Sequence, residues 1–204
     1  MNLAIKKLIE ERTSVGKYQA HIMPKVEVEE LVRLASFSPS AYNLQNWKFI
    51  AVQSDEGKQR LQSAAYGQPQ VTQASVTFIV CGQTQAHLTL AETLTLSVDQ
   101  QVIPQNVADS WVEAVKQSHE HDPSLQRDEA FRSASLAAMS LMYAAKGMGY
   151  GSGAMGGFDA QQVIEKFGLS PNDIPVMLVT VGKAADGNWQ QKIRKATTDV
   201  LQFA

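Results

Sequence analysis

Cysteine and long apolar runs are both scarce in this sequence of 204 residues. Its one cysteine, Cys81, excludes an internal disulfide bond, which suits a reducing compartment. No apolar run reaches the roughly 18–20 residues that a membrane-spanning helix needs. The first residues, MNLAIKKLIEER, are charged and lack the apolar stretch of a signal peptide. We therefore expect a cytoplasmic protein that has no membrane partner.

Neither sign of charge dominates. There are 18 Lys and Arg residues against 20 Asp and Glu residues, a formal net charge of −2. This balance provides no overall field to hold nucleic acid, so we expect no nucleic-acid partner. The composition, 44% hydrophobic and 19% charged, is that of a folded protein. The length suits a single domain over residues 1–204.

Common catalytic and metal-binding patterns are also missing. The sequence contains no Walker-type phosphate loop, no His-Glu-x-x-His motif and no arguable Ser–His–Asp or Cys–His arrangement. His119 and His121 are two residues apart, so they do not share a helix face, and we expect them on the surface at a helix end. Cys81 lies in an apolar run and should be a small buried residue. We therefore predict no metal site.

Apolar spacing predicts helices that alternate with strands. Apolar residues spaced near 3.6 residues apart indicate helices. Pro24 and the capping residue Ser54 mark the starts of two of them. Their expected ranges are 2–11, from 24 to before Pro39, 54–65, 86–98, 102–120, 128–146 and 159–167. Short runs rich in Val, Ile and Phe indicate buried strands over 47–53, 75–81 and 175–182. The predicted class is α+β or α/β, a small sheet covered by helices.

Two segments fit poorly in a lone monomer. The expected helix over 128–146 carries small and apolar residues on almost every side, which is unusual for a helix with one solvated face. The tail over 183–204 is long for a segment that has no core of its own. A large homodimer interface would explain both features.

Two short basic segments are candidate anion sites. Residues 11–18, ERTSVGKY, combine Arg12 with hydroxyl side chains, a donor set that suits a phosphate. Residues 190–195, QQKIRK, place Lys192 and Arg194 at alternate positions, so on an extended chain they point the same way. Solvated loops have the same composition, so this alternative stays open for both segments.

A glycine-rich segment, GMGYGSGAMGG, covers residues 147–157, and we expect a loop there. Within it, GSGAMG fits the G-x-G-x-x-G pattern of dinucleotide sites, but that fingerprint needs a strand before it and a helix opening on its last glycine. Here a long helical pattern precedes it. A helix end explains two or three of the six glycines. A backbone held close to a flat ligand would explain the rest.

Three motifs, taken in order, resemble those of the nitroreductase family. They are RTS at 12–14, PSAYNLQNW at 39–47 and GGFD at 156–159, and the resemblance covers nearly the whole chain. It implies a three-layer α/β/α fold of the α+β class, with a small, mostly antiparallel central sheet flanked by helices. It also implies an intertwined homodimer that binds FMN at the subunit interface.

The resemblance implies two groups of contacts to the FMN phosphate. Arg12, Thr13 and Ser14 match the N-terminal contacts, with Arg12 on the phosphate itself. Lys192 and Arg194 match a C-terminal basic pair that closes on the same phosphate. Two basic clusters at opposite ends of the sequence would then serve one anion.

The loop before the first strand has a different implied role. Pro39, Ser40, Ala41 and Asn43 match a loop that touches the flavin held by the other subunit. Trp47 and the apolar residues after it would anchor this loop in the core. The many polar groups at the entrance to that strand would then serve the partner's cofactor.

Two further segments match contacts to the flavin ring. Gln68 and Gln70 match a polar turn that hydrogen-bonds the pyrimidine side of the ring. Met155, Gly156 and Gly157 match a segment that lies along the isoalloxazine, where a backbone N–H reaches flavin N5. Glycine suits such a position because a backbone can then approach a ring closely.

The implied activity is an FMN-dependent oxidoreductase of the nitroreductase or quinone reductase type. NADH or NADPH would be the electron donor, and a nitroaromatic or a quinone would be the acceptor in a ping-pong sequence. No side chain is expected to be catalytic, because flavin N5 carries the chemistry and the protein supplies binding and orientation.

Three departures from the family pattern qualify this picture. Gly16 stands where relatives often have a basic residue near flavin N1 and O2, and the nearest base is Lys17. Asn46 replaces the proline of a QPW motif, and Ala154-Met155-Gly156 replaces a segment that often carries Pro and Glu. Two alternatives therefore remain: a non-catalytic flavin-binding or redox-sensing protein of the same fold, and an unrelated phosphate-binding module.

Overall fold

The computed structural model describes residues 3–204, and a four-stranded antiparallel sheet lies at its centre. The strand order is β1-β2-β4-β3, which confirms the predicted antiparallel sheet. The strands are β1 (Trp47–Val52), β2 (Val76–Gln83), β3 (Gly151–Met155) and β4 (Asp173–Gly182). β2 is buried at every position except its last, because its run of β-branched and aromatic side chains packs on both faces of the sheet.

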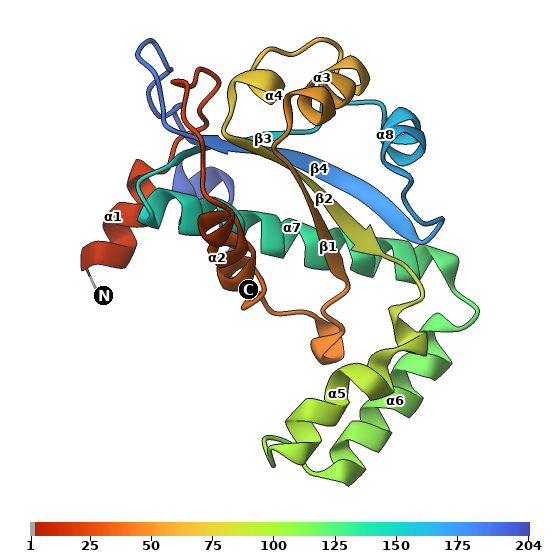
Figure 1. Ribbon diagram of the computed structural model, residues 1–204. Helices are drawn as coiled ribbons and strands as arrows, with labels where there is room; N and C mark the ends of the chain where they lie inside the picture. Colours follow the sequence, from red (N-terminus) through yellow and green to blue (C-terminus); the bar gives the residue numbers. More distant parts are fainter. Residues whose placement is uncertain (1–2) are drawn as a thin grey trace.

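Helices cover both faces of this sheet, so the fold has the predicted three layers (Figure 1). On one face, Phe78 and Val80 of β2 pack against α7 (Pro123–Gly147) and α2 (Lys25–Ala35). On the other face, Ile79 packs beneath α3 (Asp55–Ala64) and α8 (Ala160–Phe167). Burying a side chain of this size stabilises the fold by about 1.5–3 kcal/mol.

Cys81 of β2 packs on the same face of the sheet as Ile79, beneath α3 and α8, and is fully buried, as predicted. Burial raises the pKa of its thiol to about 12, so the thiol stays protonated at neutral pH. A buried thiol of this kind acts as a small apolar side chain and not as a nucleophile.

The long helix α7 begins five residues earlier than predicted. Asp122 is its N-cap and accepts a hydrogen bond from the backbone N–H of Leu125 at 2.9 Å, and Pro123 occupies the first turn. The sequence HDPS therefore holds a helix start and not a longer break. The helix crosses β2 closely at Gly82, where an added Cβ would lie 2.3 Å from the Ala130 carbonyl oxygen.

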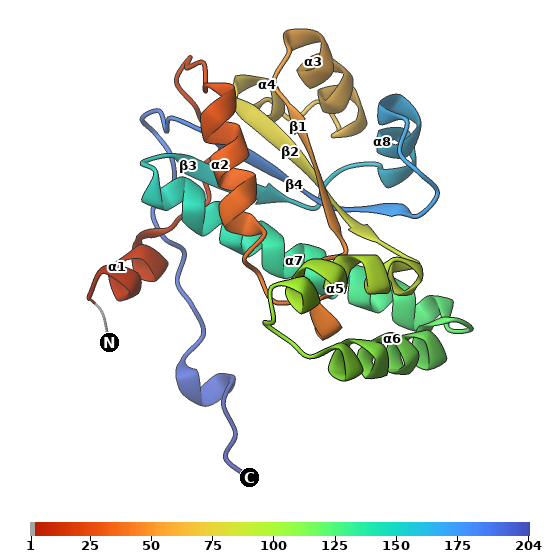
Figure 2. The same cartoon turned by 60° about the horizontal axis from the view of Figure 1, so that its bottom comes forward.

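Helices α5 (Leu90–Asp99) and α6 (Gln105–His119) form a hairpin that projects beyond the sheet (Figures 1 and 2). A short 3-10 turn, Ala86–Leu88, precedes α5, and Pro104 caps α6, so both helices start later than predicted. His119 corrects another prediction. It is buried beside His87, with ring centroids 6.2 Å apart, because the 3-10 turn packs on the end of α6.

The predicted glycine-rich loop is wrong over residues 151–155, which form the edge strand β3. Glycine is needed here for close approach and not for a turn. A Cβ on Gly153 would lie 2.4 Å from the Val15 carbonyl oxygen, so only glycine lets the N-terminal segment lie against this strand. The G-x-G-x-x-G pattern lies in β3 and the residues after it, and it opens no helix, as expected.

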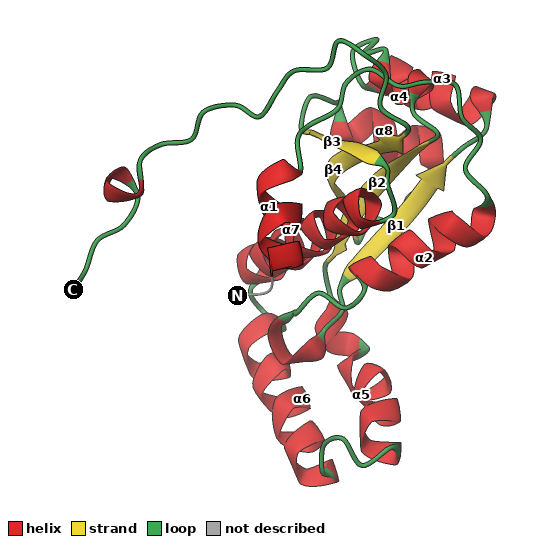
Figure 3. Ribbon diagram, turned by 90° about the vertical axis from the view of Figure 1, so that its left-hand side faces the viewer, coloured by secondary structure: helices red, strands yellow, loops and turns green. Residues whose placement is uncertain are grey.

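The remaining elements are short or peripheral. α1 (Leu3–Glu11) confirms the first predicted helix, whose residue 2 lies outside the described residues. The others are α4 (Gln70–Gln73) and 3-10 turns at Ala41–Asn43 and Thr197–Asp199. The C-terminal tail extends away from the body of the molecule (Figure 3). Across residues 3–204, no helix combines the length and apolar character that crossing a membrane requires.

Candidate functional site

The segment after α1 and the start of the tail are paired with each other, and we call residues 12–19 and 183–191 together the terminal clasp. Tyr18 forms an antiparallel bridge with Ala184. The backbone N–H of Gln19 donates to the Lys183 carbonyl at 2.8 Å. The clasp brings the segment after α1 and the start of the tail together beside the sheet.

Two amide side chains of the tail strengthen the clasp. Asn188 Oδ1 accepts hydrogen bonds from the backbone N–H groups of Gly16 and Lys17 at 2.8 and 3.0 Å, and its Nδ2 donates to the Lys17 carbonyl at 2.8 Å. Gln191 Nε2 donates to the Arg12 carbonyl at 3.1 Å across 179 residues of sequence. Sequence reasoning missed both residues, because an amide in a polar tail gives no spacing signal.

The clasp places the predicted phosphate contacts near one end of β3. Ser14 forms a parallel bridge with Ser152 of β3, and Thr13 lies between Ser14 and Arg12. Arg194 Nη1 donates to the Lys192 carbonyl at 3.0 Å, and Arg194 Nη2 donates to the side-chain oxygen of Gln191 at 3.1 Å. The two basic clusters are thus linked through Gln191 to the Arg12 backbone.

The Arg12 side chain lines a cavity of about 250 Å³ beside this strand. Its guanidinium makes no hydrogen bond or ion pair with the described residues. Thr13 and Ser152 also line the cavity, and the buried Ser152 Oγ has no hydrogen-bond partner within residues 3–204. Lys146 lines it too, paired with Glu11 at 3.6 Å. An unpaired cation beside an unsatisfied hydroxyl group is suited to an anion.

The predicted ring contacts Gln68, Gln70 and Gly157 also lie together. Gln68 Nε2 donates to the Gly157 carbonyl at 2.6 Å and to the Ala65 carbonyl at 3.2 Å. Its Oε1 accepts a hydrogen bond from Gln70 Nε2 at 3.0 Å. Both side-chain N–H donors of Gln68 are therefore used within the chain. The side chain fixes the position of the Gly157 backbone.

The segment after β3 is held on both sides of its glycines. Met155 is buried in the core, and the backbone N–H of Asp159 donates to the Ala64 carbonyl at 2.8 Å. Hydrogen bonds from the backbone and side chain of Gln162 hold the pKa of Asp159 below its usual range, as expected for the N-cap of α8. A Cβ on Gly156 would meet nothing within 4 Å. The backbone at Gly156 therefore borders open space on a rigid support.

The loop over residues 39–43 is locally strained. Tyr42 and Asn43 have φ values of 51° and 57°, and Gln45 follows with 48°. Non-glycine residues keep such values only where their surroundings fix them, which is common at ligand clamps. Ser40 Oγ accepts a hydrogen bond from the Gln45 backbone N–H at 2.9 Å. Pro39 and Asn43 are exposed, and Ala41 is half-buried.

This loop lies far from the other predicted contacts within one chain. It precedes β1, whereas α3 and the Gln68 turn follow β1, so the two groups flank opposite ends of that strand (Figure 1). Six residues of strand span roughly 20 Å. The structure therefore leaves residues 39–43 apart from the predicted contacts that lie around β3 and α3.

Comparisons with known proteins identify the family of this chain. A sequence model described as the nitroreductase family matches residues 9–183. YodC of Bacillus subtilis, which carries the name of an NAD(P)H nitroreductase, is 36% identical over 178 residues, 87% of this chain and 88% of YodC.

Solved structures share the whole fold. One from Exiguobacterium sibiricum, described as a nitroreductase in complex with FMN, is 30% identical with a TM-score of 0.90 and covers 98% of this chain and 96% of its own. Another from Staphylococcus epidermidis, described as an NAD(P)H:FMN oxidoreductase, is 25% identical with a TM-score of 0.93. It covers 100% of this chain and 97% of its own. The chain belongs to the nitroreductase family.

Proposed function

We propose that this protein is an FMN-dependent oxidoreductase that uses NADH or NADPH to reduce nitroaromatic or quinone acceptors. The observation that carries this proposal is the link through Gln191 between the Arg12 backbone and the basic tail. It gathers an anion-binding set at one end of the edge strand β3, while Gly156 borders open space at the other end. The FMN-bound relative and the relatives named for NAD(P)H support the same cofactors.

The residues present fit FMN in both charge and shape. Arg12, with no other partner among the described residues, and the unsatisfied Ser152 Oγ suit a phosphate dianion. The absence of a side chain at Gly156 leaves room for a flat ring against the backbone. The positions of Ser152 and Gly156 are separated by roughly 13 Å of extended chain, a length that a ribityl phosphate can bridge.

Each part of the site then has a role in binding. Arg12, Thr13, Ser14, Lys192 and Arg194 would hold the phosphate by charge-assisted and hydroxyl hydrogen bonds. Lys192 and Arg194 would reach that position because the terminal clasp fixes the tail before them. An anion held by two ends of the chain also ties those ends together, so binding should rigidify the tail.

The ring end of the site is positioned mainly through backbone. Met155, Gly156 and Gly157 would lie along the ring, with Gln68 fixing the Gly157 peptide and Gln70 presenting its free side-chain oxygen to the pyrimidine. Bound FMN supplies the redox chemistry, exchanging reducing equivalents first with NAD(P)H and then with the acceptor in a ping-pong sequence. The chain supplies binding, orientation and exclusion of water.

We infer that the working form is a homodimer with two shared sites. Several large apolar side chains are exposed in one chain, including Leu136 of α7 at 44%. The tail exposes more of them, at Trp189, Ile193 and Phe203. A second copy covering these surfaces would also bring residues 39–43 (Pro39, Ser40, Ala41 and Asn43 among them) to the flavin of its neighbour. NAD(P)H dependence suits a cytoplasmic enzyme.

One observation favours the alternative of a flavin-binding or redox-sensing protein. Gly16 carries no side chain, and Lys17 Nζ lies 3.1 Å from the Cβ position of Gly187, within the terminal clasp. No base then extends from position 16 toward the site to stabilise the negative charge of a reduced flavin. Steady-state turnover separates the two functions, because only the enzyme consumes NAD(P)H in proportion to added acceptor.

The absorption spectrum of the purified protein tests the proposal. We expect a yellow protein whose flavin absorbance is lost on anaerobic addition of NADH or NADPH and returns on addition of a quinone. A colourless protein that cannot be reconstituted with FMN would contradict flavin binding. Bound FMN that NADH and NADPH both fail to reduce would leave the non-catalytic alternative.

A further inference from the structure

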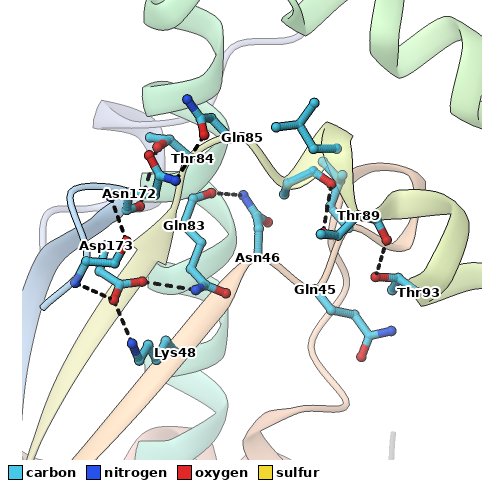
Figure 4. A pocket seen from close by; sticks show the side chains of 14 residues that line it. Gln45, Asn46, Lys48, Gln83, Thr84, Gln85, Thr89, Thr93, Asn172 and Asp173 are labelled. Carbon is cyan, nitrogen blue, oxygen red and sulfur yellow. Dashed lines mark hydrogen bonds and ion pairs between the residues drawn. The ribbon is translucent and has the colours of Figure 1, made fainter.

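A second cavity lies at the other end of the sheet from the terminal clasp. It has a volume of about 520 Å³ and opens between the start of β1, the end of β2, the start of β4 and the helix α5 (Figure 4). This size is typical of sites for small organic ligands. No residue assigned above to the FMN site lines it, although Leu44 directly follows the loop of residues 39–43.

The charged groups of this cavity neutralise each other. Lys48 Nζ donates to Asp173 Oδ2 at 2.6 Å, and Gln83 Nε2 donates to Asp173 Oδ1 at 3.0 Å. Lys48 is the sole cation among the described residues that line the cavity, and Asp173 is its sole carboxylate. The cavity therefore offers no net charge to a phosphate or a carboxylate, and a neutral ligand suits it better.

Amide side chains dominate the polar lining. They come from three separate segments of the chain: Gln45, Asn46, Gln83, Gln85 and Asn172. An amide presents one donor and one acceptor side by side, which is the pair that matches the edge of adenine. Leu44, Ala86 and Leu88 add apolar surface on which a flat base can lie.

Asn46 leaves an acceptor available in this lining. Its Nδ2 donates to the Gln83 carbonyl at 3.3 Å, and Figure 4 shows its oxygen turned away from Gln83, on the side of Gln45 and Thr89. Asn46 is 3% exposed, and this oxygen has no partner within residues 3–204. A buried oxygen without a partner has lost its hydrogen bonds to water, and an N–H donor from a ligand would replace them.

We propose that this amide-lined cavity binds the adenosine half of the nicotinamide cofactor. The proposal rests on the proposed function, in which NADH or NADPH is the electron donor. Leu44 and Gln45 continue the loop that is assigned to the flavin of the neighbouring subunit. In the proposed dimer the cavity would therefore lie near the shared site. An adenosine bound here would anchor NAD(P)H while its nicotinamide reaches the ring.

Two threonines of α5 provide a matched test. Thr93 lines the cavity, and Thr95 does not. Each donates its hydroxyl to the carbonyl four residues earlier, at 3.1 Å for Thr93 and 3.0 Å for Thr95. Thr93→Phe should fill the cavity. Thr95→Phe adds the same side chain to the same helix at a position outside the cavity.

Calorimetric titration of the FMN-loaded protein with adenosine is the first measurement. We expect adenosine to bind the wild type and the Thr95→Phe variant, and to bind Thr93→Phe at least tenfold more weakly. Adenosine 2′-phosphate should bind the wild type more weakly than adenosine does. No binding of adenosine, an equal loss in both variants, or tighter binding of the phosphate would overturn the proposal. If Thr93→Phe does not fold, Asn46→Leu replaces it with the same expected loss.

Steady-state kinetics with a quinone acceptor provide the second measurement. In Thr93→Phe the KM for NADH should rise at least tenfold with kcat unchanged, while the KM for reduced nicotinamide mononucleotide, which lacks adenosine, stays as in wild type. Equal changes for both donors would overturn the proposal. Adenosine binding in a protein that does not oxidise NADH would keep the cavity as a nucleoside site and refute only the proposed function.

Discussion

Gln191 Nε2 and the Arg12 carbonyl oxygen are joined by a hydrogen bond of 3.1 Å, although the two residues are 179 positions apart. The bond uses the Arg12 backbone and leaves the guanidinium available to a ligand. Through Gln191 it also holds Arg194, whose Nη2 donates to the Gln191 side-chain oxygen at 3.1 Å. The two basic segments thus meet before any anion binds, which lowers the entropy cost of binding one.

Arg12→Ala should weaken FMN binding about ten- to hundredfold. The variant loses a charge-assisted hydrogen bond to the phosphate, worth about 1.5–3 kcal/mol. The Kd for FMN, measured by flavin fluorescence on the reconstituted protein, checks this expectation. Arg33→Ala is the control, because Arg33 pairs with Glu30 on α2, away from the site. An unchanged Kd in Arg12→Ala would mean that the phosphate is held elsewhere.

Asn188→Ala should loosen the terminal clasp without unfolding the core. It removes the acceptor of the Gly16 and Lys17 backbone N–H groups, at a cost of about 1–2 kcal/mol. Amide hydrogen exchange at Gly16 and Lys17 should become faster, while exchange in β2 stays slow. Gln190→Ala is the control, since its exposed side chain makes no hydrogen bond with the described residues. Unchanged exchange at both amides would show that the backbone pairing alone holds the clasp.

Most of the fold could be predicted from the sequence, because apolar spacing determines which face of each element is buried. The strands over 47–53, 75–81 and 175–182 and the helix after Ser54 were predicted within two or three residues. The strand β3 was missed. Its sequence, GSGAM, has the composition of a turn, and its conformation depends on pairing with β4 and on contact with Val15.

The candidate site could be predicted in part. The RTS and GGFD motifs carry residues whose type suits their role, so Arg12 and Gly156 could be named from the sequence. Asn188 and Gln191 could not, because they act through backbone groups that only the folded chain brings near. His119 was placed on the surface for a similar reason: the turn that buries it comes from residues 86–88.

Asp173 should stabilise the fold at neutral pH and lose that effect in acid. Burial raises the pKa of this carboxyl, but hydrogen bonds from Lys48, Gln83 and the Ser170 backbone outweigh burial and hold the pKa below its usual range. A carboxyl whose pKa is lower in the folded state stabilises the fold at pH values above its unfolded pKa. That stabilisation is lost as the pH falls through the folded pKa.

Thermal unfolding of Asp173→Asn against pH measures this effect. The variant should be less stable than wild type at pH 7 by about 1–3 kcal/mol, because Lys48 and Gln83 lose a charged acceptor. The difference should shrink as the pH drops below the usual range of an aspartate. Asp99→Asn, at an exposed position on α5, should show little difference at any pH. A constant difference for Asp173→Asn across this range would mean that its charge is not involved.

Leu136→Arg should convert the protein to a monomer and release FMN in the same step. Leu136 is 44% exposed on α7, and a buried, unpaired charge in a dimer interface is strongly unfavourable. Sedimentation velocity would give the oligomeric state, and the flavin absorbance of each species would give its FMN content. Gln161→Arg, on exposed α8 at the other face of the sheet, adds the same charge and should remain a yellow dimer. Because residues 39–43 lie apart from the other flavin contacts within one chain, a stable monomer that keeps its FMN would contradict the shared site.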